Sequence, residues 1–165
     1  MRILGNKFKG GSMKIRLKKE GFTLIELLIV VAVIGIIAAI AIPNLLNAIQ
    51  RGKQKRTMAD MRAIGTAVES YAVDNNEYPA GGSPVSGISA DLEPRYIAQM
   101  VENDAWNHAI DYTSSPSGSP QTYSIESYGK NGTNETTAAG QTTDFNNDII
   151  FSQGLFVQYP EGSQK

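Results

Sequence analysis

The chain has 165 residues, with 15 basic and 16 acidic side chains, one histidine and no cysteine. The lack of cysteine excludes disulfide bonds and, with a single histidine, effectively excludes a zinc site or a cysteine–histidine nucleophile pair. The net charge of the whole chain is close to zero, but the charges are unevenly distributed along it. Residues 1–21 carry seven bases and one acid, whereas residues 22–165 carry eight bases and fifteen acids, a net charge of −7. We therefore expect the two ends of the chain to lie in different environments.

An apolar run of 21 residues, from Phe22 to Ile42, follows the basic stretch. As a helix it would be roughly 31 Å long, the thickness of a bilayer's hydrocarbon core. We expect it to span a membrane, with the basic residues cytoplasmic and the following chain translocated. One acid, Glu26, lies near its start. A carboxylate there costs a few kcal/mol to insert, so Glu26 is a functional-site candidate that needs a partner.

The small-residue step expected of a cleavage site lies before the apolar run, between Gly21 and Phe22. Cleavage there would keep the apolar helix in the mature protein. Translation from Met1 or from Met13 fits the pattern equally, and the later start leaves a leader of nine residues.

The segment KKEGFTLIELLIVVAVIGIIAAIAIP, residues 18–43, resembles the N-terminal segment of the type IV pilin and pseudopilin superfamily. The resemblance implies that a prepilin peptidase cleaves after Gly21 and methylates the new amine of Phe22. It also implies that Glu26 and Pro43 act in filament assembly. In a packed filament Glu26 can pair with a Phe22 amine, its own or a neighbour's, and so offset the cost of burying each charge. The alternative is an ordinary signal anchor with a stray acid.

The helical pattern continues beyond Pro43, which would kink the helix rather than end it. An amphipathic stripe recurs at steps of three and four, formed by Met58, Met61, Ile64, Val68 and Tyr71. We expect the helix to run to about Asp74 and to be ended by the Asn75-Asn76 pair and Pro79.

A basic belt lies on this helix and consists of Arg51, Lys53, Lys55, Arg56 and Arg62. Residues 63–165 hold three bases and thirteen acids, a net charge of −10. The belt could face the acidic head of an adjacent subunit, or equally be solvated or attracted to anionic lipid headgroups. Nucleic acid is not expected as the main ligand, because the belt adjoins a membrane segment and lacks interleaved aromatic residues.

The remainder predicts a small head. Residues 79–89 read as a loop, residues 91–100 as a short helix, and residues 109–113 and 121–126 as strands. Residues 148–152 and 155–159 are expected to form the two strands of a hairpin, with its turn at Gln153 and Gly154.

The predicted fold class is therefore α+β. A long N-terminal helix, transmembrane in its first half and amphipathic in its second, packs on a small antiparallel sheet. The domain organisation is a cleaved leader (1–21), a transmembrane and filament-core helix (22–42), an amphipathic continuation (43–78) and a globular head (79–165).

Residues 91–112, DLEPRYIAQMVENDAWNHAIDY, resemble the corresponding region of the major pseudopilins of type II secretion. The match rests on the Pro-Arg-Tyr at 94–96 and on Asp104 and Trp106. Ala105 and Asn107 stand where that family has proline and glycine. We expect Trp106 to pack against the long helix.

The same resemblance implies a calcium loop, because major pseudopilins bind calcium after their second strand. SYGKNG (127–132) and TDFNND (143–148) are similar to its two parts. Calcium takes six to eight oxygen ligands. The candidate ligands are Ser127, Asn131, Asp144, Asn147 and Asp148. Asn131 replaces a charged ligand, and NETTAAGQ (134–141) lengthens the loop, so a turn-rich loop without metal is the alternative.

No enzyme is predicted. The sequence has neither a Gly-x-Ser-x-Gly elbow nor a phosphate-binding glycine loop. His108 beside Asp111 is interpreted as part of a surface turn rather than a catalytic pair.

These features predict a filament subunit that polymerises through its N-terminal helix, most similar to a major pseudopilin of type II secretion. The implied partners are further copies of the chain, the prepilin peptidase, an inner-membrane assembly platform and ATPase, minor pseudopilins or pilins, and membrane lipid before assembly. The implied location is a single pass through the inner membrane, with the head and the filament in the periplasm. One alternative is a type IV pilin for attachment, motility or DNA uptake at the cell surface. Another is an anchored domain that never polymerises.

Overall fold

The computed structural model describes residues 21–135 and 139–161. The leader before Gly21 and both candidate translation starts, Met1 and Met13, lie outside these residues. The chain divides into two compact units, Met1–Ile40 and Ala41–Lys165.

A single helix, α1, covers Leu24–Asn75 and includes Pro43. The helix thus continues past the proline, as its apolar periodicity predicts. It ends one residue beyond the expected Asp74, where Asn76 takes a left-handed φ of 60°. Asparagine tolerates this conformation better than most residues do, which suits it to stop a helix. Within the described residues, α1 is the one helix long and apolar enough to cross a membrane.

The first part of α1 leaves its apolar side chains uncovered. Every large apolar residue between Leu24 and Ile42 is exposed, with Leu24 at 81% and Val33 at 49%. Contiguous apolar surface of this extent is characteristic of a segment that lipid or protein covers. This part of the chain therefore requires a non-aqueous environment.

The second unit has its two short helices earlier than the sequence predicts. The 3₁₀ helix η1 covers Val85–Ile88 and α2 covers Ser89–Leu92, whereas a helix was expected at residues 91–100. That expectation is wrong because Glu93 precedes Pro94 and is extended, with ψ of 144°. A residue before proline is sterically pushed away from helical geometry.

Five strands form one sheet in the order β1-β2-β4-β5-β3. Their bounds are Asp111–Ser115 for β1, Thr122–Ser127 for β2, Gly140–Thr142 for β3, Ile149–Ser152 for β4 and Leu155–Pro160 for β5. The predicted hairpin is confirmed, since Gln153 and Gly154 between β4 and β5 both have positive φ, at 48° and 81°. β3 was not predicted, and it pairs with β5 in parallel. The sheet is therefore mostly, but not entirely, antiparallel.

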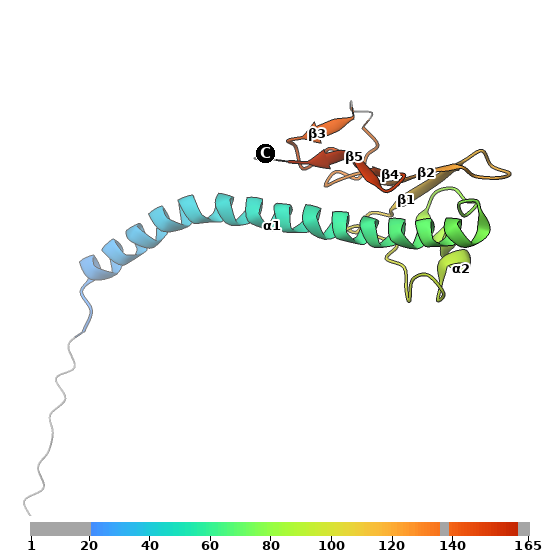
Figure 1. The fold of residues 1–165 in the computed structure, drawn as a ribbon. Coiled ribbons are helices and arrows are strands. Elements are labelled where there is room, and N and C mark those ends of the chain that lie inside the picture. Colours follow the sequence, from blue (N-terminus) through green and yellow to red (C-terminus); the bar gives the residue numbers. More distant parts are fainter. Residues whose placement is uncertain (1–20, 136–138, 162–165) are drawn as a thin grey trace, which may run out of the picture. The chain divides into compact units, whose positions relative to one another are not determined.

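The core lies between the second half of α1 and the sheet (Figure 1). Met61, Ile64 and Val68 of the predicted stripe are fully buried, and Met58 and Tyr71 are partly buried against them. The sheet contributes Tyr112, Tyr123, Ile125, Ile149 and Phe151. In strand β2 every second side chain is buried and those between are exposed or half-buried, which is the pattern of a sheet with one face on a core.

Candidate processing and assembly site

Glu26 is held at the start of α1 by Thr23. Its carboxylate accepts hydrogen bonds from the Thr23 backbone N–H and from the Thr23 hydroxyl, both at 2.8 Å. In return, the Glu26 N–H donates to the Thr23 hydroxyl oxygen at 3.3 Å. This reciprocal arrangement is a capping box, in which two otherwise unpaired amides of the first helical turn are satisfied. Sequence reasoning missed Thr23, although the Thr-x-x-Glu spacing ahead of an apolar run was a usable signal.

The predicted cleavage point lies beside this cap. Gly21, Phe22, Thr23 and Glu26 line one shallow pocket, and Phe22 is 89% exposed. The peptide bond between Gly21 and Phe22 precedes the first helical residue, Leu24, so it lies in non-helical chain that a peptidase could engage. A free amine at Phe22 would arise within four residues of the Glu26 carboxylate. The third assembly candidate, Pro43, lies inside α1.

The loop around Trp106 docks on α1 through two polar contacts. The Trp106 indole N–H donates to Gln50 Oε1 at 2.7 Å, and the Ala105 N–H donates to the Thr57 hydroxyl oxygen at 3.1 Å. Trp106 is half-buried, so it contacts the helix as expected without entering the core.

Asp104 organises this loop from a buried position. Its Oδ1 accepts the backbone N–H groups of Trp106 and His108, each at 2.9 Å, and its Oδ2 accepts the Ser127 hydroxyl at 2.8 Å. Asn107 has φ of 71°, a left-handed conformation for which glycine is the usual choice. Asparagine can adopt this left-handed conformation, so it can stand at the position where the family has glycine.

His108 belongs to the same loop rather than to a pair with Asp111. Its Nδ1 lies 3.0 Å from the Gly129 carbonyl oxygen and 3.9 Å from Asp104 Oδ2. The Ser127, Asp104 and His108 side chains are therefore close, but the serine hydroxyl donates to the carboxylate and not to the imidazole. Ser127 is fully buried, and a catalytic triad needs the imidazole on the serine hydroxyl, so these contacts are not arranged as a triad and instead hold the loop.

The two segments of the predicted calcium loop lie against each other. The Lys130 N–H donates to the Phe145 carbonyl at 2.9 Å, and a Cβ on Gly129 would come within 2.7 Å of the carbonyl oxygens of Asn146 and Asn147. Gly129 also has φ of 60°. Glycine is needed here on both counts, because the backbones approach closely and the conformation is left-handed.

The five candidate ligands have different partners. Ser127 bonds to Asp104, and Asp144 Oδ1 accepts the Asn146 N–H at 2.9 Å. Asn131 donates to Glu135 Oε1 at 2.7 Å, and the Glu135 N–H donates to Asp148 Oδ2 at 2.9 Å. The Asn147 N–H donates to the Asp144 carbonyl at 3.3 Å. The contacts thus link Asn131 and Asp148 through Glu135, a residue that the sequence reasoning did not select.

Asp148 is the member that best fits a cation ligand. It is 3% exposed, and its Oδ1 is buried without a hydrogen-bond partner. Burial raises its pKa to about 6. A cation would satisfy this oxygen, whereas Ser127 and Asp144 are already engaged. Residues 21–135 and 139–161 contain no group of three or more histidine, cysteine, aspartate or glutamate side chains placed to hold a metal.

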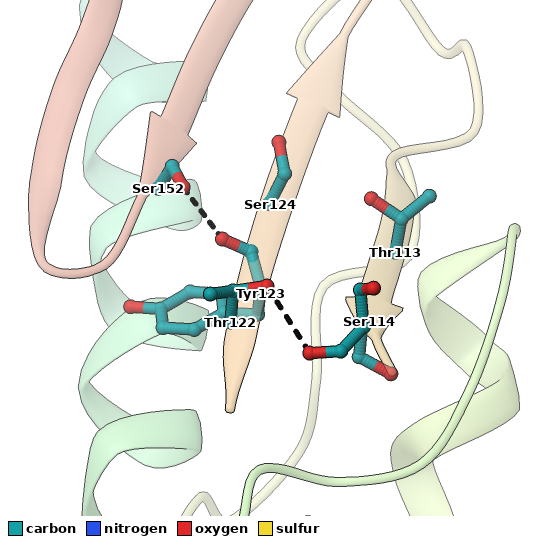
Figure 2. Close-up of a pocket in the computed structure, with 7 residues that line it drawn as sticks. Thr113, Ser114, Thr122, Tyr123, Ser124 and Ser152 are labelled. Carbon is teal, nitrogen blue, oxygen red and sulfur yellow. Dashed lines mark hydrogen bonds between the residues drawn. The ribbon is translucent and has the colours of Figure 1, made fainter. Parts of the chain in front are cut away.

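The outer face of the sheet carries a hydroxyl-lined pocket that the sequence did not indicate. Figure 2 shows side chains from β1, β2 and β4 around it, with Ser152 donating to the Tyr123 carbonyl at 2.6 Å. Its lining consists of Thr113, Ser114, Ser115, Thr122, Tyr123, Ser124 and Ser152. None of these is a carboxylate, imidazole or amine, although the Ser124 hydroxyl donates to Glu126 Oε1 at 3.0 Å.

An exposed apolar helix with a capped glutamate at its start, continuing into a helix packed on a small sheet, defines a pilin-like chain. Consistent with this class, the family model of the prokaryotic N-terminal methylation motif matches residues 16–42. The model of type II secretion system protein G matches residues 44–148, and the chain belongs to that family.

Similar proteins come from both branches of the superfamily. Type II secretion system core protein G of Vibrio cholerae is 32% identical over 111 residues, covering 62% of this chain and 75% of the relative. The protein of the same name from Escherichia coli is 25% identical over 124 residues, covering 70% and 84%. The type IV major pilin protein PilA of Myxococcus xanthus is 48% identical over 121 residues, covering 57% of this chain and 55% of PilA. No solved structure matches the chain significantly.

Proposed function

We propose that the chain is the major subunit of a type II secretion pseudopilus, a filament that assembles from the inner membrane and moves exported protein. The observation that carries this proposal is the capped Glu26 at the start of a helix whose large apolar side chains are exposed from Leu24 to Ile49. The match to type II secretion system protein G over residues 44–148 supports the choice of filament.

In the proposed mechanism, a prepilin peptidase cleaves between Gly21 and Phe22 and methylates the Phe22 amine. Glu26 then exchanges its bonds to Thr23 for an ion pair with the Phe22 amine of another copy. The pair neutralises two charges that would each be costly to bury alone. The apolar side chains from Leu24 onward exchange lipid for neighbouring helices, and Pro43 adjusts the helix for packing. No catalytic role is proposed for any residue.

The partners follow from the mechanism. The sequence has no nucleotide-binding motif, so we propose that an assembly ATPase and a membrane platform supply the energy for filament assembly. Minor pseudopilins are proposed as further components. The head lies in the periplasm, because the basic residues 2–19 precede the span.

The test compares Glu26→Gln and Glu26→Ala with Glu102→Gln, which alters an exposed head acid. We expect the Glu26 variants to be processed and methylated like the parent but to form few filaments, measured by shearing and electron microscopy. Glu102→Gln should assemble normally. Filaments at parental yield from processed Glu26→Ala would contradict the pairing role.

A type IV pilin is the second candidate, favoured by the 48% identity to PilA. The two functions differ in phenotype. A deletion strain that loses export of a secreted protein, and regains it with this chain, supports the pseudopilin. Loss of surface filaments and of attachment or motility, with normal export, supports the pilin.

We also propose calcium binding centred on Asp148, where the unpaired Oδ1 fits a cation ligand. Calcium would neutralise a buried carboxylate and tie together the loops at 128–132 and 144–148. The expected result is a higher unfolding midpoint of the full chain in calcium than in chelator, lost in Asp148→Asn. An unchanged midpoint at millimolar calcium would contradict this proposal.

A further inference from the structure

Four cations of the basic belt lie immediately after the exposed apolar residues with which the second unit begins. These membrane-proximal cations are Arg51, Lys53, Lys55 and Arg56. Before them, Ile42, Leu45, Leu46 and Ile49 are exposed at 56%, 61%, 54% and 47%. Since a helix rises about 1.5 Å per residue, the cations begin only about 3 Å beyond Ile49. Exposed apolar surface is therefore followed directly by positive side chains, of which Arg51, Lys55 and Arg56 are exposed and Lys53 is half-buried.

Three of these cations have no partner within the described chain. Arg51, Lys53 and Lys55 make no hydrogen bond or ion pair with any residue in 21–135 or 139–161. Arg56 makes one exposed pair with Asp60 at 3.6 Å, of a kind that contributes little. The fifth belt residue, Arg62, instead lies over the Phe156 ring at 5.3 Å. Within the described residues, Asp60 is thus the one acid that pairs with this group of charges, and it pairs with Arg56 alone.

The arrangement of the cations around α1 indicates what covers them. At about 100° per residue, the four positions spread over roughly 200° of the helix circumference. The remaining face carries Gln54 and Thr57, which are buried at 3% and 0% exposure. The cations consequently occupy nearly all of the helix surface that the head leaves open. A single protein partner would contact one stripe, about 100° wide. A layer of headgroups surrounds a helix on every open side.

We propose that the membrane-proximal cations form a collar that binds the phosphates of anionic phospholipid headgroups. The proposal rests on the membrane anchoring included in the proposed function. Counted from Ile42, Arg51 lies about 13 Å along the helix, beyond a headgroup layer of roughly 5–8 Å. Long basic side chains extend back toward the interface, and exposed Leu45 and Ile49 draw the helix into it. The collar sets the depth of the subunit in the bilayer and holds it there until assembly.

The test uses the full chain, which has no cysteine, with one probe site introduced. Gly52→Cys places an environment-sensitive fluorophore within the collar, at a position where a Cβ would meet nothing within 4 Å. The labelled chain is reconstituted in phosphatidylcholine vesicles with and without phosphatidylglycerol, and quenching by headgroup-attached quenchers is measured. Resistance to alkaline extraction shows separately that the chain is anchored. Filament formation is not part of the readout, so failure of assembly and failure of the collar are distinguishable.

We expect stronger quenching in vesicles containing phosphatidylglycerol and loss of this difference at high salt, because screening weakens contact with headgroups. The Arg51→Gln/Lys53→Gln/Lys55→Gln chain should lose the difference while remaining anchored and folded. Arg95→Gln removes an exposed cation of the head that is paired with Asp74 of α1, and this variant should retain the difference between the two lipids. Equal quenching in both lipids overturns the proposal. If quenching in pure phosphatidylcholine vesicles instead rises with the number of chains per vesicle, the proposal is also overturned. The cations would then contact the acidic head of a second copy.

Discussion

Gly65 of α1 lies close against Phe151 of the sheet, and its replacement by alanine tests how the head is packed. A Cβ at this position would lie 2.2 Å from Cε1 of Phe151. Carbon atoms in contact prefer about 3.5–4.0 Å, so either the ring or the helix must move. The Phe151 ring has little freedom, because it is 3% exposed and packs edge-on against Phe156 with centroids 4.9 Å apart.

Two opposing effects set the magnitude. Alanine is favoured over glycine in a helix by about 1 kcal/mol. Overpacking a core typically costs about 1–3 kcal/mol, and an approach of 2.2 Å belongs at the upper end. We therefore expect Gly65→Ala to lower the free energy of unfolding of the head by roughly 1–2 kcal/mol. Gly52→Ala is the matched control, since a Cβ there meets nothing within 4 Å. It should raise stability by up to about 1 kcal/mol.

The assay is thermal unfolding of the full chain in detergent micelles, followed by near-ultraviolet circular dichroism and by Trp106 fluorescence. At about 4 °C per kcal/mol, the two variants should melt several degrees apart, with Gly65→Ala lower. Gly65→Ala/Phe151→Leu should recover part of the loss, because a smaller, more flexible side chain relieves the contact. A Gly65→Ala midpoint equal to or above that of Gly52→Ala would refute the close packing.

Further variants at three positions test the loop and the cap. Asp104→Ala removes the acceptor of two amides and one buried hydroxyl, and should cost roughly 3 kcal/mol of unfolding free energy by denaturant titration. Asn107→Gly should leave stability nearly unchanged, whereas Asn107→Val should cost about 1–3 kcal/mol, because a β-branched residue is strained at φ of 71°. Thr23→Ala should speed amide exchange in the first turn of α1 by about fivefold, the equivalent of about 1 kcal/mol of capping. Thr23→Ser should not, since serine keeps the hydroxyl.

The N-terminal site could be predicted from the sequence because its determinants are local. The predicted cleavage after Gly21, the apolar run and the position of Glu26 all depend on residues adjacent in the chain, and the capping box joins residues three positions apart. The buried stripe of α1 followed from periodicity alone, and so did the β4–β5 hairpin with its Gln153-Gly154 turn. In each case the spacing of residues along the chain fixes which side chains lie on the same face of a helix or strand.

Contacts between distant segments were decided only by the tertiary structure. β3 is three residues at the end of the insertion, with no alternating pattern, and pairs with β5 because the fold brings that edge within reach. Glu135 joins Asn131 to Asp148, and Ser127 turns to Asp104, 23 residues earlier. The spread of cations around the open face of α1 likewise required knowing which face the head covers. Short-range spacing determines helices, turns and caps, whereas partners far apart in sequence are selected by the packing of the whole core.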